Sequence, residues 1–189
     1  MKNIKSIKTI KLLAVLFMSS IAFVSCSSDD DDHDNHDHEE ELITTVKYTL
    51  TNGVDFVTLE FQDLDGEGGA DGTYDISGPL TANTTYTGTI QLLNETESPA
   101  DNITLEVQEE GDEHEFFYTP SISDITITKD DSDVDGNPIG ILTTLTTGTA
   151  GIGSLTIELI HEPTKPNDGT SANAGGSTDV QVTFAIEVQ

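Results

Sequence analysis

This chain of 189 residues contains one cysteine, no tryptophan and no arginine. A lone cysteine cannot close a disulfide within the chain, so the fold must be held together by core packing or by bound ions. Without arginine, seven lysines face 35 acidic residues, and the formal net charge is −28. Such a charge repels the phosphates of nucleic acids and anionic lipid surfaces, and it attracts cations. Nucleic acid is therefore excluded as a partner.

Long hydrophobic runs are also absent. The most apolar stretch, residues 12–24, is too short to cross a bilayer core of about 30 Å as a helix, which needs roughly 20 residues. It follows four lysines within the first eleven residues and precedes the small residue Ser25. A basic start, a short apolar run and a small residue before a cleavage point are typical of a signal peptide. We therefore expect this segment to be removed from the mature protein.

Cys26 stands directly behind the apolar segment. The sequence Phe23-Val24-Ser25-Cys26 resembles a bacterial lipobox, in which Leu is more usual at the place of Phe23. The acidic run at residues 29–32 resembles the surface-export signal of Bacteroidota lipoproteins. These resemblances imply that residues 1–25 form a lipoprotein signal peptide and that acyl chains on Cys26 anchor the protein in outer-membrane lipid, exposed at the cell surface. The alternative is an ordinary signal peptide followed by an incidental cysteine.

A low-complexity segment follows, and residues 26–41 are predicted to form a disordered acidic tether that begins at the lipidated Cys26. Behind the cysteine this segment has no apolar residue, so it cannot bury enough surface to fold. Imidazole and carboxylate groups are good ligands for zinc and related ions. The histidines of the tether are therefore candidate metal ligands, or they only interrupt an acidic spacer: His33, His36 and His38.

From residue 42 onward, apolar and polar residues alternate, and turn residues interrupt them at short intervals. Val46, Tyr48 and Leu50 alternate with polar residues and lead into Asn52-Gly53, the strongest short signal for a β-hairpin. Further strands are predicted in residues 57–61, 84–93, 102–108, 114–119, 125–128, 141–146, 154–161 and 179–188. No stretch shows the apolar period of a helix. Residues 42–189 are therefore predicted to form an all-β domain, an antiparallel immunoglobulin-like β-sandwich of about seven to nine strands.

Two histidine–glutamate pairs lie on predicted strands. Alternation places His114 on one face with Phe116, and it places His161 on the apolar face of its strand. Two histidines on the inner faces of one sandwich can approach each other, with a carboxylate at a strand end, and form a two-His, one-carboxylate metal site. The candidate carboxylates are Glu113, Glu115 and Glu162. The alternative is that each histidine is hydrogen-bonded separately at the rim of a sheet.

A second candidate cation site is an acidic loop. Its oxygen ligands stand at alternate positions, with a glycine at the sixth position, as in an EF-hand calcium loop. They belong to Asp131, Asp133, Asp135 and Asn137. The glutamate that such loops carry at the twelfth position is absent, and no helices are expected on either side. The loop therefore predicts either calcium binding or simple turn chemistry.

Motifs of the common enzyme classes are absent. The sequence has no nucleophile elbow, no HExxH metalloprotease motif and no glycine-rich phosphate loop. The one cysteine is assigned to the lipid anchor. We therefore expect a non-catalytic protein.

The chain as a whole resembles a group of short Bacteroidota lipoproteins. The segments that carry the resemblance are Glu113–Tyr118, Asp135–Gly140, Leu159–Pro163 and Thr178–Phe184. Some members of the group are described as having a type 1 periplasmic binding fold, which consists of two α/β lobes. This chain lacks alternating strand and helix patterns, which favours the all-β sandwich instead.

These patterns together predict a cell-envelope lipoprotein whose extracytoplasmic domain binds a ligand without catalysis. The histidine–glutamate pairs and the tether favour a divalent metal, zinc or calcium, as the ligand, held for a neighbouring transporter. The alternative is a structural or adhesive surface module that recognises a glycan or a protein.

Overall fold

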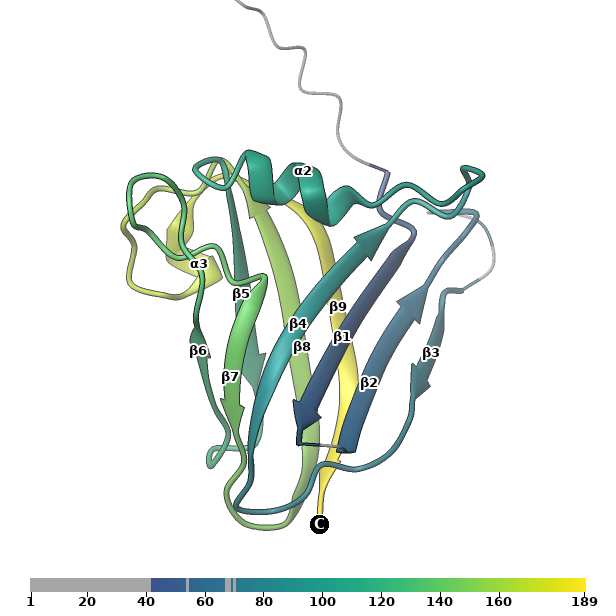
Figure 1. The fold of residues 1–189 in the computed structure, drawn as a ribbon, viewed down its shortest axis with the longest axis vertical. Coiled ribbons are helices and arrows are strands. Elements are labelled where there is room, and N and C mark those ends of the chain that lie inside the picture. The colour runs from purple at the N-terminus through teal and green to yellow at the C-terminus, as the bar shows by residue number, and fades with distance from the viewer. Residues whose placement is uncertain (1–41, 54, 67–68, 70) are drawn as a thin grey trace, which may run out of the picture. The chain divides into compact units, whose positions relative to one another are not determined.

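The computed structural model describes residues 42–189, except residues 54, 67–68 and 70. This part of the chain forms two antiparallel β-sheets that face each other, with helix α2 (Ile103–Glu109) across one end and the short helix α3 (Ser171–Ala174) beside the smaller sheet (Figure 1). The predicted signal peptide, Cys26 and the histidines of the tether lie outside the described residues. Within the described residues, no helix is both long and apolar enough to span a membrane.

Most strands lie where the alternation of apolar and polar residues predicts them. In chain order they are β1 (Thr45–Asn52), β2 (Asp55–Gln62), β3 (Thr73–Ile76), β4 (Thr85–Leu93), β5 (His114–Pro120), β6 (Thr126–Lys129), β7 (Leu142–Thr146), β8 (Gly151–His161) and β9 (Ser177–Val188). β1 and β2 form the predicted hairpin, in which Asn52 pairs with Asp55 and Gly53 has a positive φ of 64°. Glycine adopts this conformation without the steric cost that other residues would meet.

The strand order defines the type of sandwich. The larger sheet has the order β3-β2-β1-β4-β7-β6, and the smaller sheet has the order β5-β8-β9. The strands β1-β4-β7-β6 opposite β5-β8-β9 reproduce the ABED and CFG sheets of a constant-type immunoglobulin domain. β2 and β3 extend the larger sheet beyond its first strand. The prediction of an antiparallel immunoglobulin-like sandwich is therefore confirmed for the described part of the chain.

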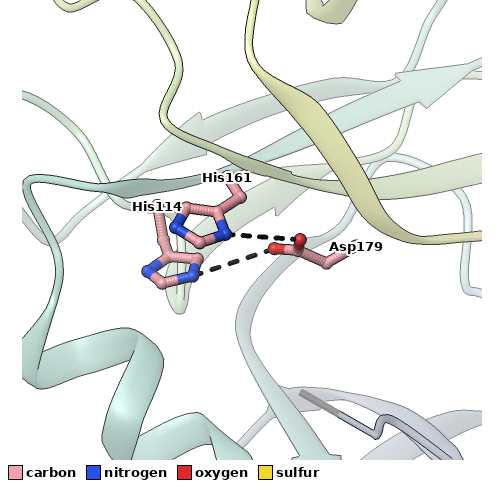
Figure 2. A group of neighbouring side chains, drawn as sticks. All are labelled: His114, His161 and Asp179. Atoms are coloured by element: carbon pink, nitrogen blue, oxygen red, sulfur yellow. Dashed lines mark ion pairs between the residues drawn. The ribbon is translucent and has the colours of Figure 1, made fainter. Parts of the chain in front are cut away.

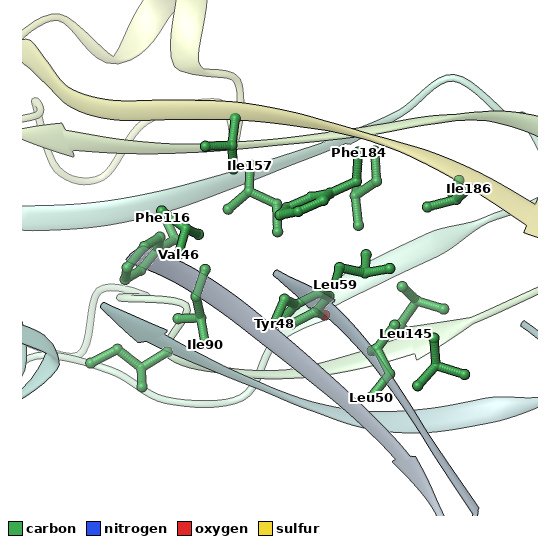
Figure 3. Packing of buried hydrophobic residues seen from close by; sticks show 14 of the residues in the cluster. Val46, Tyr48, Leu50, Leu59, Ile90, Phe116, Leu145, Ile157, Phe184 and Ile186 are labelled. Carbon is green, nitrogen blue, oxygen red and sulfur yellow. The ribbon is translucent and has the colours of Figure 1, made fainter. Parts of the chain in front are cut away.

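The inner faces of the two sheets meet in one hydrophobic core (Figure 3). β1 contributes Val46, Tyr48 and Leu50 to this core. β9 contributes Phe184 and Ile186 from the opposite sheet. Burying a large apolar side chain stabilises the fold by about 1.5–3 kcal/mol relative to leaving it in water. The period of two along each strand thus decides which face is buried.

One polar contact lies in the middle of this core. The hydroxyl oxygen of Tyr48 lies 2.6 Å from Thr143 Oγ1 on β7, and both side chains are fully buried. Burial raises the pKa of the Tyr48 phenol well above its usual range, so the hydroxyl stays protonated. Gly88, on the intervening strand β4, leaves space for this contact. A Cβ atom at Gly88 would lie 2.2 Å from Thr143 Oγ1 and 2.4 Å from the Tyr48 hydroxyl oxygen.

α2 occupies the segment for which alternation predicts a strand, residues 102–108, and that prediction is wrong. In a strand, Leu105 would share a buried face with its apolar neighbours, but it is 58% exposed. The buried residues follow helical spacing instead: Ile103, Thr104 and Val107. The Thr104 hydroxyl accepts the N–H of Leu92 at 2.7 Å and lies 3.3 Å from the Leu92 carbonyl oxygen. Docking of the helix on the end of β4 therefore overrides the local β pattern.

Two short elements are not predicted by the sequence pattern. β3 is a four-residue edge strand whose side chains are mostly exposed, so it has almost no apolar alternation. α3 is a single turn that buries only Ala174, which packs with Phe117 and Ile160 on the outer face of the smaller sheet. Segments of this length are too short for a period to be recognised.

Gly88→Ala should destabilise the domain by about 1–3 kcal/mol, because the added methyl group displaces the Tyr48–Thr143 contact in a packed core. Urea denaturation of the purified protein measures the free energy of unfolding. Gly78→Ala is the matched control, since a Cβ atom at Gly78 has no neighbour within 4 Å. Equal unfolding free energies for the two variants would contradict this account of the core.

Candidate metal centre

His114 and His161 face each other across two paired strands. His114 is the first residue of β5, His161 is the last residue of β8, and the two are direct register partners. Each shares a strand face with a core residue two positions away, Phe116 on β5 and Leu159 on β8. The two rings stack with centroids 4.7 Å apart and an angle of 23° between their planes (Figure 2). The strand register thus brings together two side chains whose separation the sequence leaves open.

The third member of the cluster is Asp179 on β9. Strict alternation places this residue on the outer face of the strand. A β-bulge changes the alternation: Leu159 pairs with Val180, but the next residue, Ile160, pairs with Thr178. Asp179 is therefore the extra residue of the bulge, and its carboxylate lies beside both histidine rings (Figure 2). Bulges next to functional sites often re-aim a side chain in this way.

The spacing of the three side chains is close to that of zinc ligands. One donor atom from each lies within 4.8 Å of the other two. His114 Nε2 is 3.8 Å from Asp179 Oδ2, and His161 Nδ1 is 3.8 Å from Asp179 Oδ1. Zinc binds nitrogen and oxygen ligands at about 2.0–2.2 Å, so two donors of a tetrahedral site lie about 3.4 Å apart. The two contacts with Asp179, one to each carboxylate oxygen, are about 0.4 Å longer than this separation.

The ring of His114 is oriented by α2. Its Nδ1 lies 3.1 Å from the carbonyl oxygen of Glu110, the residue that caps the C-terminal end of the helix. A carbonyl oxygen can only accept, so Nδ1 carries a hydrogen, and Nε2 is the ring nitrogen that faces Asp179. Histidines that bind metals commonly donate their second N–H to such an oxygen. The cluster is largely enclosed, with side-chain exposures of 4% for His114, 15% for His161 and 10% for Asp179.

The three glutamates predicted from the sequence take different positions. Glu113 lies nearest, with Oε2 3.9 Å from His161 Nε2, and its side chain is 40% exposed. Glu162 is exposed, and its N–H donates to the carbonyl oxygen of Glu113 at 2.6 Å. Glu115 follows His114 directly and lies on the opposite face of β5. The three-donor cluster therefore uses Asp179 and none of these glutamates.

Asp179 is the site residue that the sequence pattern does not indicate, because the bulge that re-aims it depends on pairing with β8. The clearest local signal is the pair Gly175-Gly176 before the strand, in which both residues have a φ of 71°. A Cβ atom at the second of these glycines would lie 2.1 Å from the carbonyl oxygen of His161. The glycine therefore allows the start of β9 to approach the cluster closely.

The predicted calcium loop is closed by its own hydrogen bonds. The two carboxylate oxygens of Asp131 accept backbone N–H groups from further along the chain at 2.8 and 3.0 Å. Asp133 Oδ1 accepts the N–H groups of Asp135 and Asn137 at 3.0 and 2.8 Å. These oxygens accept amide hydrogens, and among the described residues no three His, Cys, Asp or Glu side chains in this loop are grouped so that they could hold a metal ion.

Beside this loop, a lysine ammonium group pairs with one of the acidic residues. Lys165 Nζ donates to Asp133 Oδ2 at 3.3 Å, and its side chain is 6% exposed. It also donates to the carbonyl oxygens of Gly111 at 2.5 Å and His114 at 2.7 Å. Burial alone would raise the pKa of Asp133, but hydrogen bonds from Asn137 and Lys165 outweigh burial and lower the pKa. Lys165 thus joins the acidic loop to β5, the strand that carries His114.

Comparisons of this chain with protein families, with curated proteins and with solved structures find no match.

Lys165→Met should destabilise the domain by about 3–5 kcal/mol, because it removes the cation of a buried ion pair and leaves the Asp133 carboxylate buried without it. Lys47→Met is the control, since the ion pair of Lys47 with Glu60 is partly exposed and contributes at most about 1 kcal/mol. The measurement is denaturant unfolding at several pH values. The pKa of Asp133 is lowered in the fold, so the contribution of its carboxylate is present above about pH 4 and is lost as the pH falls through the lowered pKa.

The difference in unfolding free energy between the wild type and Lys165→Met should therefore become smaller at acidic pH. Two results would contradict the role assigned to Lys165. One is a loss of unfolding free energy in Lys165→Met no larger than that in Lys47→Met, and the other is a loss that does not change with pH.

Proposed function

We propose that this protein is a lipid-anchored cell-envelope protein whose sandwich domain binds a divalent transition metal ion, with zinc the best match, and does not act as an enzyme. The observation that carries the proposal is the convergence of His114, His161 and Asp179 from three strands onto one enclosed position (Figure 2). Two imidazole nitrogens and a carboxylate oxygen suit zinc, whereas calcium and magnesium prefer oxygen ligands alone.

The number of donors favours a site that exchanges its ion. Structural zinc sites usually have four protein ligands, whereas three protein ligands leave one position for water or for a donor from another molecule. Catalytic zinc sites share the three-ligand pattern, but the low exposure of these side chains leaves little room for a substrate. Binding of an ion and its transfer to a neighbouring transporter therefore fit the site better than catalysis.

The charge of the chain supports a cation as the ligand. Four of the seven lysines lie in the predicted signal peptide, whereas all 35 acidic residues follow it. A strongly negative field raises the local concentration of cations and speeds their association. The tether histidines would add weaker donors to this field: His33, His36 and His38.

The proposed location rests on the segment around Cys26. A basic start, a short apolar run and a lipobox-like sequence all precede this cysteine, and the chain resembles short Bacteroidota lipoproteins. Each buried CH₂ of an acyl chain contributes about 0.8 kcal/mol, and more than one chain makes the anchoring stable. The acidic run behind the cysteine favours the cell surface.

Calorimetric titration of zinc into the purified full chain tests the metal site. The background variant replaces the tether histidines by alanine: His33, His36 and His38. In this background we expect one zinc ion to bind per chain. Replacing a residue that only supports a metal ligand typically lowers metal affinity by roughly 10–100-fold. Asp179→Asn removes a ligand itself and should therefore lower zinc affinity by more than this. His161→Ala should have the same effect. Asp135→Asn, an exposed aspartate outside the cluster, is the matched control and should bind zinc like the background variant.

Unchanged binding in Asp179→Asn would contradict the proposed ligand set. An absence of binding to the background variant would confine metal affinity to the tether and favour a structural or adhesive module that recognises a glycan or a protein. Zinc should also stabilise the background variant against unfolding, by about 2.7 kcal/mol at a free concentration 100 times the Kd. A chelator should reverse this stabilisation.

Cys26→Ala should abolish membrane anchoring in a bacterium that processes lipoproteins, because it removes the atom that carries the acyl chains. The measurement is incorporation of a clickable palmitate analogue, together with fractionation of the cells. Ser27→Ala is the control and should be labelled and sediment with membranes like the wild type. Palmitate labelling of Cys26→Ala at the level of the wild type would contradict the assignment.

A further inference from the structure

A buried carboxylate on the outer face of β5 bridges an amine and a carboxamide. Glu115 is 1% exposed. Its Oε1 accepts a hydrogen bond from Lys129 Nζ on β6. Its Oε2 accepts a hydrogen bond from Asn167 Nδ2, in the segment between β8 and α3, at 2.7 Å. The two nitrogens are therefore neighbours on one carboxylate, although their residues lie far apart in the sequence.

The amine of this cluster, Lys129 Nζ, lies beside an aromatic ring in a largely enclosed position, which favours its neutral, nucleophilic form. Lys129 Nζ lies 4.1 Å from the centre of the Phe117 ring, and the lysine side chain is 15% exposed. Burial lowers the pKa of Lys129, and the hydrogen bond to Glu115 opposes this shift without cancelling it. A lower pKa increases the fraction of neutral amine, which is the form that attacks a carbonyl carbon.

The carboxamide is held at both of its polar atoms. Asn167 Oδ1 accepts the N–H of Gly169 at 2.8 Å, and Nδ2 donates to the carbonyl oxygen of Thr164 at 3.0 Å as well as to Glu115. An N–H directed at the amide oxygen stabilises the negative charge that develops there when a nucleophile adds to Cγ. The carboxylate at Nδ2 is in place to deliver a proton to the departing nitrogen.

We propose that Lys129 and Asn167 join in an intramolecular isopeptide bond, with Glu115 as the proton carrier. The lone pair of neutral Lys129 Nζ adds to Asn167 Cγ, and Glu115 takes up a proton that Nζ loses. The tetrahedral intermediate collapses when the Cγ–Nδ2 bond breaks and Glu115 delivers a proton to Nδ2, which leaves as ammonia. One N–H and one C–N bond break, and one C–N and one N–H bond form. The step therefore needs no oxidant, reductant or second substrate.

This bond ties together parts of the fold that no disulfide can join. β6 is one of the two edge strands of the larger sheet, whereas Asn167 follows β8, the central strand of the smaller sheet. The chain has no cysteine after Cys26, and an amide is a covalent link that needs none. A pocket of about 360 Å³ is lined by Glu115, Lys129 and Asn167 among others, and it gives ammonia a way out. A cross-link of this kind stabilises a fold mainly by restricting the unfolded chain.

Tryptic mapping of the purified full chain, unfolded before digestion, tests the bond. The chain has no arginine, and Lys165 is followed by proline, which blocks trypsin. Beyond the tether the enzyme therefore cuts after Lys47 and Lys129 alone. Acylation of Lys129 prevents the second cut. We expect residues 48–189 to remain one fragment, with a mass about 17 Da below that of its sequence because ammonia has left.

Two fragments of full mass, residues 48–129 and 130–189, would overturn the proposal. A loss of about 17 Da from the second fragment with the cut after Lys129 intact would overturn it too, because it indicates a cyclic imide at an asparagine.

Four variants complete the test. Glu115→Gln removes the proton carrier and Asn167→Ala removes the carbonyl carbon, so both should yield the two fragments of full mass. Asn173→Ala is the matched control, since the Asn173 amide donates to Asp168 outside the cluster. It should keep the single fragment, and an uncut fragment in Asn167→Ala would overturn the assignment. His114→Ala should map like the wild type, so this result is independent of the metal site.

Discussion

The register of β5, β8 and β9 determines where His114, His161 and Asp179 lie relative to one another. His114 and His161 are register partners, and the bulge opposite Ile160 adds Asp179 to them. A slip of one residue in either strand pair would turn every side chain of a strand to its other face and separate the three donors. The alternating apolar residues oppose such a slip, because it would expose a whole buried face to water. Hydrophobic burial thus sets the geometry of a polar site.

β5 carries different chemistry on its two faces. His114 belongs to the cluster on the inner face, and Glu115, the next residue, belongs to the cluster on the outer face. The segment between β8 and α3 donates hydrogen bonds to both of these residues. Lys165 donates to the carbonyl oxygen of His114, and two residues later Asn167 donates to Glu115. The two clusters are therefore held in part by hydrogen bonds from the same segment, although they lie on different faces of the sheet.

Two lysines of this acidic domain lie inside it. Lys129 pairs with Glu115 and Lys165 pairs with Asp133, and both carboxylates are 1% exposed. A buried carboxylate requires a cation or several N–H donors, because desolvation penalises an unpaired charge. Both amino groups are directed inward, so these lysines do little to neutralise the acidic surface. The field that remains favours cations as ligands.

The sequence by itself determined most of the strands, their buried faces and the inward position of two histidines. These are local properties: side chains alternate along a strand, and Asn52-Gly53 turns the chain within a few residues. Only the tertiary structure decided that His114 meets His161, that a bulge turns Asp179 toward them, and that α2 is a helix docked on β4. It alone brought Lys129 and Asn167 onto one carboxylate. Strand register, helix docking and the pairing of buried charges depend on segments far apart in the sequence, and no local pattern records which distant partner a residue will meet.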